Sequence, residues 1–211
     1  MNKFILLGGG VVIIVFVLLS KDTLVEYLSG KYTPPSSCEG QSNKDACYNS
    51  VAQKNKDPEI CNKISLESGD PKSDSRDNCY SVIAEDLLKH QFCDRIKKNS
   101  GDGSRDTCYL NIATKTKNVV LCDQLTGQGV TEINGGKVYV NKDFCIHNVA
   151  LEVLDPTVCD KISTKIHKQT SPLNVSVQSC YAFLGEKKKD SVFCNKAGEL
   201  KQVCLDGVNQ K

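Results

Sequence analysis

One pattern of apolar and polar positions occurs five times along the chain. In each copy a cysteine is followed at the fourth position by an aliphatic residue and at the fifth by a small one, and a second cysteine comes 14 positions after the first. The cysteine and the positions one, four and five residues later share one face of an α-helix. The pattern therefore predicts an amphipathic helix in each copy. The copies lie near residues 45–64, 77–96, 106–125, 143–162 and 178–197.

Polar residues mark where these helices should begin. A good N-cap stands four residues before each first cysteine: Asn43, Ser75, Ser104, Asn141 and Ser176. A second, shorter helix is predicted around each second cysteine, because Asp57-Pro58 and Asp155-Pro156 combine an N-cap with a proline in the first turn. Asn118 and Asp190 occupy the same cap position, and Lys89 is the exception. Helices of about two turns are marginal alone, so packing and covalent bonds must hold them.

Two disulfide pairings compete. Pairing within the 14-residue spacing leaves Cys38 and Cys204 over, at opposite ends of the array. Pairing across the variable loops uses every cysteine, and it joins residues about one turn from a connecting loop, which face each other on antiparallel helices. We favour this second scheme, in which each closure contributes roughly 2–4 kcal/mol. It predicts Cys38–Cys47, Cys61–Cys79, Cys93–Cys108, Cys122–Cys145, Cys159–Cys180 and Cys194–Cys204.

The loop between the third and fourth copies carries a different pattern. Residues 130–140 read VTEINGGKVYV, in which Asn134-Gly135 separates two runs of alternating apolar residues. This is a strong signal for a β-hairpin. Its edge at Val138, Tyr139 and Val140 is a candidate for pairing with a partner strand. The alternative is an insertion without a function.

The N-terminal residues predict an association with a membrane. An uncharged run from Phe4 to Ser20 lies between Lys3 and Lys21, and its 17 residues are at the low end for a membrane-spanning helix. Because the run lacks a small-residue cleavage pattern, we interpret residues 1–32 as an uncleaved signal anchor with its helical extension, N-terminus inside. Secretion after cleavage is the alternative. Residues 33–37 are predicted to be a linker, and residues 38–211 an extracytoplasmic repeat domain.

Composition and motifs argue against several functions. The chain has 12 cysteines, no Trp and a net charge of +2, so it lacks the basic field expected of a nucleic-acid-binding protein. C-x-x-C, H-E-x-x-H, G-x-S-x-G and P-loop motifs are absent, so we predict no catalytic, cofactor or metal site. His147 is predicted to be a surface histidine. Asn174-Val175-Ser176 is a glycosylation sequon, which makes Asn174 a possible modification site.

The repeated motif resembles that of a group of proteins. DACYNSVA…DPEICNKI and its four copies follow the pattern CYxxxA…DPxxCxxI, which is similar to cysteine-rich helical repeats of uncharacterised exported or membrane-anchored proteins, many of them archaeal. Two copies depart from it, with Ile146 in place of Tyr and Gly185 in place of Ala. The resemblance covers about Cys38 to Cys204 and implies an architecture without implying an activity.

These observations predict an all-α, solenoid-like array of disulfide-stapled helical hairpins with one β-hairpin insert, preceded by a transmembrane helix. Repeat arrays offer extended surfaces, with variable loops on a rigid frame. We therefore expect a non-catalytic binding or scaffold module at the cell surface that contacts other proteins or itself. The alternative is a structural subunit of a surface filament or of a larger membrane complex, with the apolar N-terminal helix buried in the assembly.

Overall fold

A computed structural model describes residues 30, 32–65, 76–97, 104–133, 136–163 and 175–210. The chain divides into two compact parts, residues 1–33 and 34–211. The predicted membrane segment, residues 4–20, lies outside the described residues. Among the residues that are described, no helix is long and apolar enough to cross a membrane.

Each repeat opens with an α-helix of 12 residues. The polar residue before the helix caps it as predicted, because the side chains of Asn43, Ser104, Asn141 and Ser176 each accept a hydrogen bond from a backbone N–H in the first turn. Ser75 lies outside the described residues. The five helices are α2 (Lys44–Asn55), α3 (Arg76–Leu87), α4 (Arg105–Thr116), α5 (Lys142–Val153) and α7 (Val177–Lys188).

All five helices end on a residue in the left-handed conformation. This position favours glycine, yet each repeat has a long side chain there, with φ between 52° and 57°. The residues are Lys56, Leu88, Lys117, Leu154 and Lys189. The left-handed residue reverses the chain, so that the second helix of the repeat packs beside the first.

The second helices are tighter than an α-helix in four of the five repeats. They are the 3₁₀ segments η2 (Pro58–Lys63), η3 (His90–Arg95), η4 (Val119–Gln124) and η5 (Phe193–Lys196), together with the four-residue α6 (Pro156–Cys159). Asp57, Asn118, Asp155 and Asp190 accept a hydrogen bond from the backbone N–H two residues later. Lys89 makes no such bond, as its side chain predicts. The predicted caps are thus confirmed, whereas the 3₁₀ form was not foreseen.

Short helical segments close both ends of the array. The 3₁₀ helix η1 (Pro35–Cys38) precedes the first repeat, so the predicted linker includes the start of an ordered element. After the fifth repeat, η6 (Gly198–Leu200) leads into α8 (Lys201–Asn209), which packs on α7. A side chain at Gly185 would bring its Cβ within 2.7 Å of the sulfur of Cys204. The glycine that departs from the repeat pattern therefore makes room for the last disulfide.

The cysteines pair across the connecting segments, in the order that the sequence favoured. All twelve lie in described residues, none is free, and the Cα–Cα distances are 5.5–5.8 Å. The bonds are Cys38–Cys47, Cys61–Cys79, Cys93–Cys108, Cys122–Cys145, Cys159–Cys180 and Cys194–Cys204. Each bond therefore joins one repeat, or a terminal segment, to the next.

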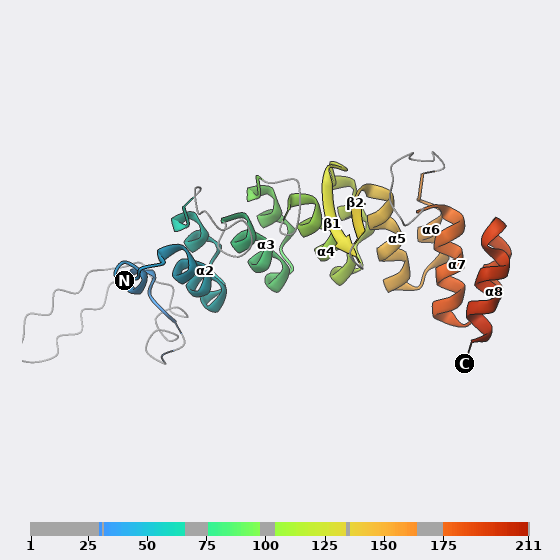
Figure 1. The fold of residues 1–211 in the computed structure, drawn as a ribbon, viewed down its shortest axis with the longest axis horizontal. Helices are drawn as coiled ribbons and strands as arrows, with labels where there is room; N and C mark the ends of the chain where they lie inside the picture. The colour runs from blue at the N-terminus through green and yellow to red at the C-terminus, as the bar shows by residue number, and fades with distance from the viewer. Residues whose placement is uncertain are drawn as a thin grey trace, which may run out of the picture. The chain divides into compact units, whose positions relative to one another are not determined.

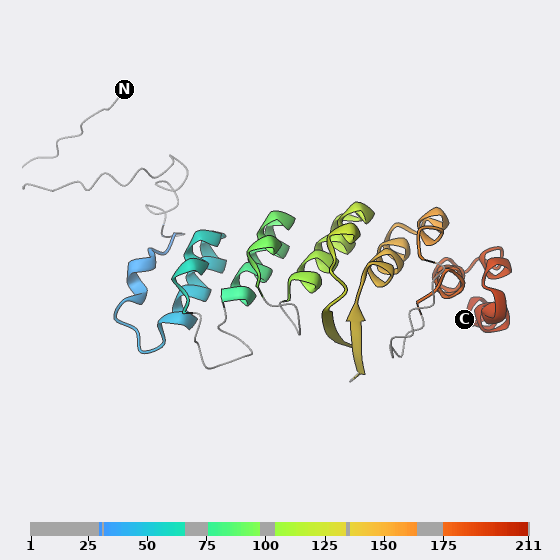
Figure 2. The same ribbon diagram turned by 90° about the horizontal axis from the view of Figure 1, so that it is seen from above.

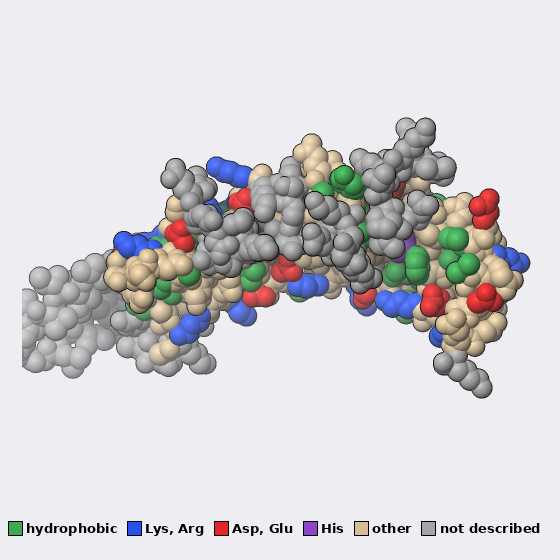
Figure 3. Space-filling model, viewed as in Figure 1, with side chains coloured by type: hydrophobic (Ala, Val, Ile, Leu, Met, Phe, Trp, Pro, Cys, Tyr) green, Lys and Arg blue, Asp and Glu red, His purple; other side chains and the backbone are tan. Residues whose placement is uncertain are grey.

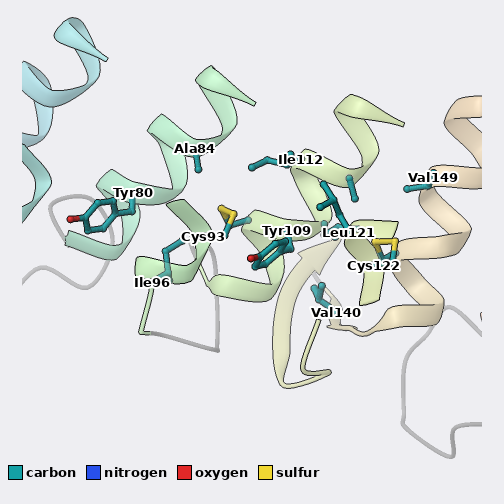
Figure 4. Close-up of a cluster of buried hydrophobic side chains, with 14 of the residues drawn as sticks. Tyr80, Ala84, Cys93, Ile96, Tyr109, Ile112, Leu121, Cys122, Val140 and Val149 are labelled. Atoms are coloured by element: carbon teal, nitrogen blue, oxygen red, sulfur yellow. A yellow bond between two sulfur atoms is a disulfide. The ribbon is translucent and has the colours of Figure 1, made fainter. Parts of the chain in front are cut away.

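The repeats stack one after another within residues 34–211. Each first helix packs against the next, from α2 through α3, α4, α5 and α7 to α8 (Figure 1). Turning the molecule shows the hairpin on one side of the row and the ends of α3, α4 and α5 on the other (Figure 2). The core lies between the helices and consists of a tyrosine or isoleucine, aliphatic residues and disulfide sulfurs from each repeat, with an alanine from each of repeats 1 to 4 (Figure 4).

The predicted β-hairpin is present between the third and fourth repeats. Strand β1 (Gly129–Ile133) pairs antiparallel with β2 (Gly136–Val140), and Val130 lies opposite Tyr139. Val138 and Val140 are buried in the core between α4 and α5. The two strands form a sheet of their own.

Candidate functional site

A polar contact accompanies the disulfides that link neighbouring repeats. The tyrosine after a first cysteine donates its hydroxyl hydrogen to the residue after the partner cysteine. The distance is 2.7 Å from Tyr80 to Asn62 and 2.8 Å from Tyr109 to Asp94. Tyr48 bonds to Glu39 and Tyr181 to Asp160 in the same way. The tyrosine row is thus part of the contact between repeats.

A basic residue three positions before the first cysteine supports the same contact. Arg105 contacts Asp94 at 3.0 Å, and Lys44 contacts Glu39. Arg76 donates instead to the carbonyl oxygens of Asn62 and Ile64. These residues extend the polar contact beside three of the disulfides.

The fourth repeat shows how this contact tolerates the loss of its tyrosine. Ile146 has no hydroxyl, but Lys142 pairs with Asp123 at 2.6 Å. The basic residue therefore keeps a contact with the acidic residue that follows the partner cysteine, even where the tyrosine is missing.

Burial and hydrogen bonding keep Tyr109 protonated. The pKa of Tyr109 is raised to about 12, first because burial disfavours the phenolate and then because its hydroxyl donates to Asp94. The guanidinium of Arg105 lies 4.8 Å from the centre of the same ring, in a cation–π contact. A phenol with such a pKa donates a hydrogen bond at neutral pH but does not act as a base. The Tyr109 hydroxyl therefore serves as a hydrogen-bond donor in the contact between repeats.

One buried carboxylate attaches the hairpin to the array. Asp106 is fully buried, and it accepts hydrogen bonds from the backbone N–H groups of Thr126, Gln128 and Gly129 and from the Thr126 hydroxyl, at 2.8–3.2 Å. A Cβ on Gly129 would lie 2.6 Å from the Cβ of Asp106, so only glycine allows this approach. The base of β1 is therefore held firmly against α4.

The repeat pattern itself marks the position of Asp106. An aspartate stands two residues before the first cysteine in four of the five repeats. In repeats 1 and 4 this aspartate accepts a hydrogen bond from the backbone N–H that follows the second helix. Ser65 donates to Asp45, and Ser163 donates to Asp143. Repeat 3 uses the same aspartate to hold the start of an inserted hairpin. The hairpin is thus built onto a contact that the repeat already makes.

Part of the predicted partner edge is buried in the core. The side chains of Val138 and Val140 are buried, whereas Tyr139 is half-buried. Pairs along an antiparallel hairpin alternate between those that exchange backbone hydrogen bonds and those that direct N–H and C=O groups outward. Because Ile133 pairs with Gly136 at the end of the ladder, the alternation along the strands places Tyr139 in the outward set. The part of this edge that remains for a partner is therefore the backbone at Tyr139.

His147 is not the surface residue that the sequence predicted. It lies on α5 with its Nε2 atom buried and without a hydrogen-bond partner, and its ring meets the ring of Phe183 edge-on at 5.5 Å. Burial lowers its pKa to about 4. The prediction was wrong because α7 packs over a position that looks outward in a single repeat. Leu110 occupies the same position in repeat 3 and is buried as well.

This burial makes stability depend on pH. In the folded chain His147 stays neutral down to about pH 4, whereas an unfolded histidine takes up a proton near pH 6.5. Acid therefore favours the unfolded state, and stability present above pH 6.5 falls by about 3 kcal/mol as the pH drops to 4. His147→Leu should remove this loss in denaturant titrations at both pH values. The same substitution at exposed His90 is the control, and equal pH dependence in wild type and His147→Leu would contradict the assignment.

The predicted glycosylation sequon is only partly within the described residues. Asn174 lies outside the described residues, although Ser176 of its sequon is the N-cap of α7. Among the described residues, no three His, Cys, Asp or Glu side chains are grouped so that they can hold a metal ion.

These features place the chain in the class of mostly helical, disulfide-linked proteins, with a small two-stranded sheet attached. Comparisons with protein-family models, with curated proteins and with solved structures found no match to this chain. The resemblance to exported cysteine-rich repeats therefore stays a prediction.

Proposed function

We propose that this protein is a non-catalytic binding or scaffold module, held at the outer surface of a membrane by residues 4–20. Its contact surface would be the loop edge, which we define as the edge formed by the hairpin segment, residues 126–133 and 136–141, between repeats 3 and 4. Six disulfides are consistent with an oxidising compartment outside the cytoplasm.

The attachment of the hairpin by Asp106 carries this proposal. Four hydrogen bonds to the buried carboxylate of Asp106 fix the start of the hairpin on α4, so the hairpin projects from the array as a rigid element. A rigid hairpin reduces the entropy lost when a partner strand pairs with its edge. A protein partner that adds an extended strand at Tyr139 fits this geometry.

The test compares two substitutions at one residue. Tyr139→Pro removes the outward N–H group and blocks strand addition, whereas Tyr139→Phe keeps the backbone and most of the side chain. The tagged full-length chain is cross-linked in its native membrane, and the partners are identified and quantified. We expect Tyr139→Pro to reduce recovery of the partner by about tenfold or more, and Tyr139→Phe to leave it unchanged.

Two results would contradict the proposal. One is a wild-type chain that cross-links to no other protein, and the other is a partner that Tyr139→Pro retains in full. Recovery of large assemblies built from this chain and fixed membrane subunits, insensitive to both variants, would favour the structural role instead. Unfolding curves of both variants show whether the array itself is intact.

A further inference from the structure

A second surface lies at the other end of the repeats. We call it the turn edge, and it consists of the residues that join the first helix to the second in each repeat: 53–59, 85–91, 114–120, 151–157 and 186–192. In Figure 2, α3, α4 and α5 end on the side of the array opposite the hairpin. The turn edge is therefore separate from the loop edge.

Exposed apolar side chains recur along the turn edge. Repeats 2 to 5 each have one, namely Leu88, Val120, Leu154 and Val192, with 47%, 64%, 38% and 67% of the residue exposed. Repeat 1 has Lys56 and Glu59 at the corresponding positions. The apolar row thus covers four repeats, and its centre lies between repeats 3 and 4.

Two members of this row occupy a conformation that would suit glycine better. Leu88 and Leu154 have φ values of 54° and 57°. A leucine costs free energy there that glycine avoids, and its exposed side chain recovers little by packing within the chain. Lysines occupy the same conformation in the other three repeats, so the backbone does not select leucine, and burial against a partner would stabilise the exposed apolar side chain.

The charges of the turn edge change sign at the same centre. In repeat 3 the edge carries Lys115 and Lys117 and no acidic residue, and in repeat 4 it carries Glu152 and Asp155 and no basic residue. Within the chain Lys115 pairs with Glu85 and Glu152 with Lys187, so a second copy would meet these pairs together with Lys117 and Asp155. Repeat 2 has two acidic residues and one lysine in this edge, whereas repeat 5 has three lysines and two acidic residues. Going outward from the centre on one side, the net charge of the edge is positive in repeat 3 and negative in repeat 2. On the other side it is negative in repeat 4 and positive in repeat 5.

We propose that the turn edge binds a second copy of this chain in antiparallel orientation, with a twofold axis between repeats 3 and 4. A twofold interface uses the same patch on both chains. Repeat 3 then faces repeat 4 of the other copy, so that lysines meet acidic residues and Val120 meets Leu154. Repeat 2 faces repeat 5, and Leu88 meets Val192.

The alternatives fit the charges less well. A parallel pair would place Lys117 against Lys117, and Glu152 against Glu152, and like charges at an interface suppress association. An anionic membrane surface would be repelled by repeat 4. Exposed apolar residues also gather at the C-terminal end (Figure 3), where Phe183, Leu200 and Val203 are exposed, but these lie on α7, η6 and α8 and form no row along the repeats.

The test measures the mass of the full-length oxidised chain by sedimentation equilibrium in mild detergent. We expect a reversible dimer that Val120→Ser weakens by about tenfold or more, because both copies lose a buried valine. Val203→Ser is the matched control, since Val203 is 66% exposed on α8. A protein that stays monomeric up to about 100 µM, or a control variant that weakens the dimer equally, would overturn the proposal.

A charge exchange tests the antiparallel register. Lys117→Glu and Glu152→Lys should each weaken the dimer, because each places like charges in contact twice per dimer. The double variant restores opposite charges at both contacts, so its dissociation constant should return to within about threefold of the wild-type value. A double variant that is weaker than both single variants would rule out this register. Tyr139→Pro should leave the dimer unchanged, which keeps this test separate from that of the loop edge.

Discussion

Reduction of the six disulfides should unfold the repeat array. The bonds close segments with sequence separations of 9 to 23 residues, and closing a segment of this length stabilises a fold by about 3 kcal/mol. Six such contributions exceed the 5–15 kcal/mol by which domains are typically stable. The helices have no more than 12 residues and their partners no more than six, so neither should persist alone.

Far-UV circular dichroism and labelling of thiols follow this transition together. Before reduction, an alkylating reagent should label no cysteine, because none is free. During titration with a phosphine reductant, the helical signal should fall as the twelve thiols become accessible. A native helical signal after all twelve thiols have been labelled would show that the apolar core suffices without covalent bonds.

Asp106→Ala should lower the free energy of unfolding by about 3 kcal/mol or more. The substitution leaves three backbone N–H groups beneath the hairpin without their acceptor, and each buried unsatisfied group costs about 1–3 kcal/mol. Solvent can reach part of the site once the hairpin moves, so the loss should stay below the sum of these costs. Urea titration measures the change directly.

Asp45 provides the matched control for this prediction. It occupies the same position in repeat 1, where its carboxylate accepts from the amide of Ser65 at an exposed site. Asp45→Ala should therefore cost about 1 kcal/mol. Hydrogen exchange adds a local measurement, since Asp106→Ala should accelerate exchange at Gln128 and Gly129. Equal effects of the two substitutions would mean that Asp106 does not hold the hairpin.

Contacts between repeats follow a rule that no single repeat reveals. Where a tyrosine follows one cysteine, its hydroxyl bonds to the residue after the partner cysteine, as Tyr109 does with Asp94. The disulfide and the hydrogen bond thus join the same two repeats at adjacent positions. In repeat 4 the ion pair of Lys142 with Asp123 occurs in place of the tyrosine contact. These polar contacts orient neighbouring repeats, and the disulfides keep them together.

The local features of the fold could be predicted from the sequence. The N-caps at Asn43, Ser104 and Asn141 depend on a side chain and the backbone three residues later, and the helix faces depend on periodicity within one or two turns. The order of the disulfides followed from the same local geometry, because cysteines about one turn from a connecting segment face each other. The hairpin followed from its turn residues and alternation.

Only the tertiary structure determined what the outward positions contact. His147 is half-buried, with its Nε2 atom buried, because α7 packs over it. Val138 and Val140 are buried because the hairpin lies against α4 and α5. The role of Asp106 depends on amides 20 to 23 residues away. The physical reason is how far apart along the sequence the interacting atoms lie. Caps and periodicity depend on atoms within a few residues of one another, whereas burial and carboxylate contacts depend on segments that meet only when the repeats stack.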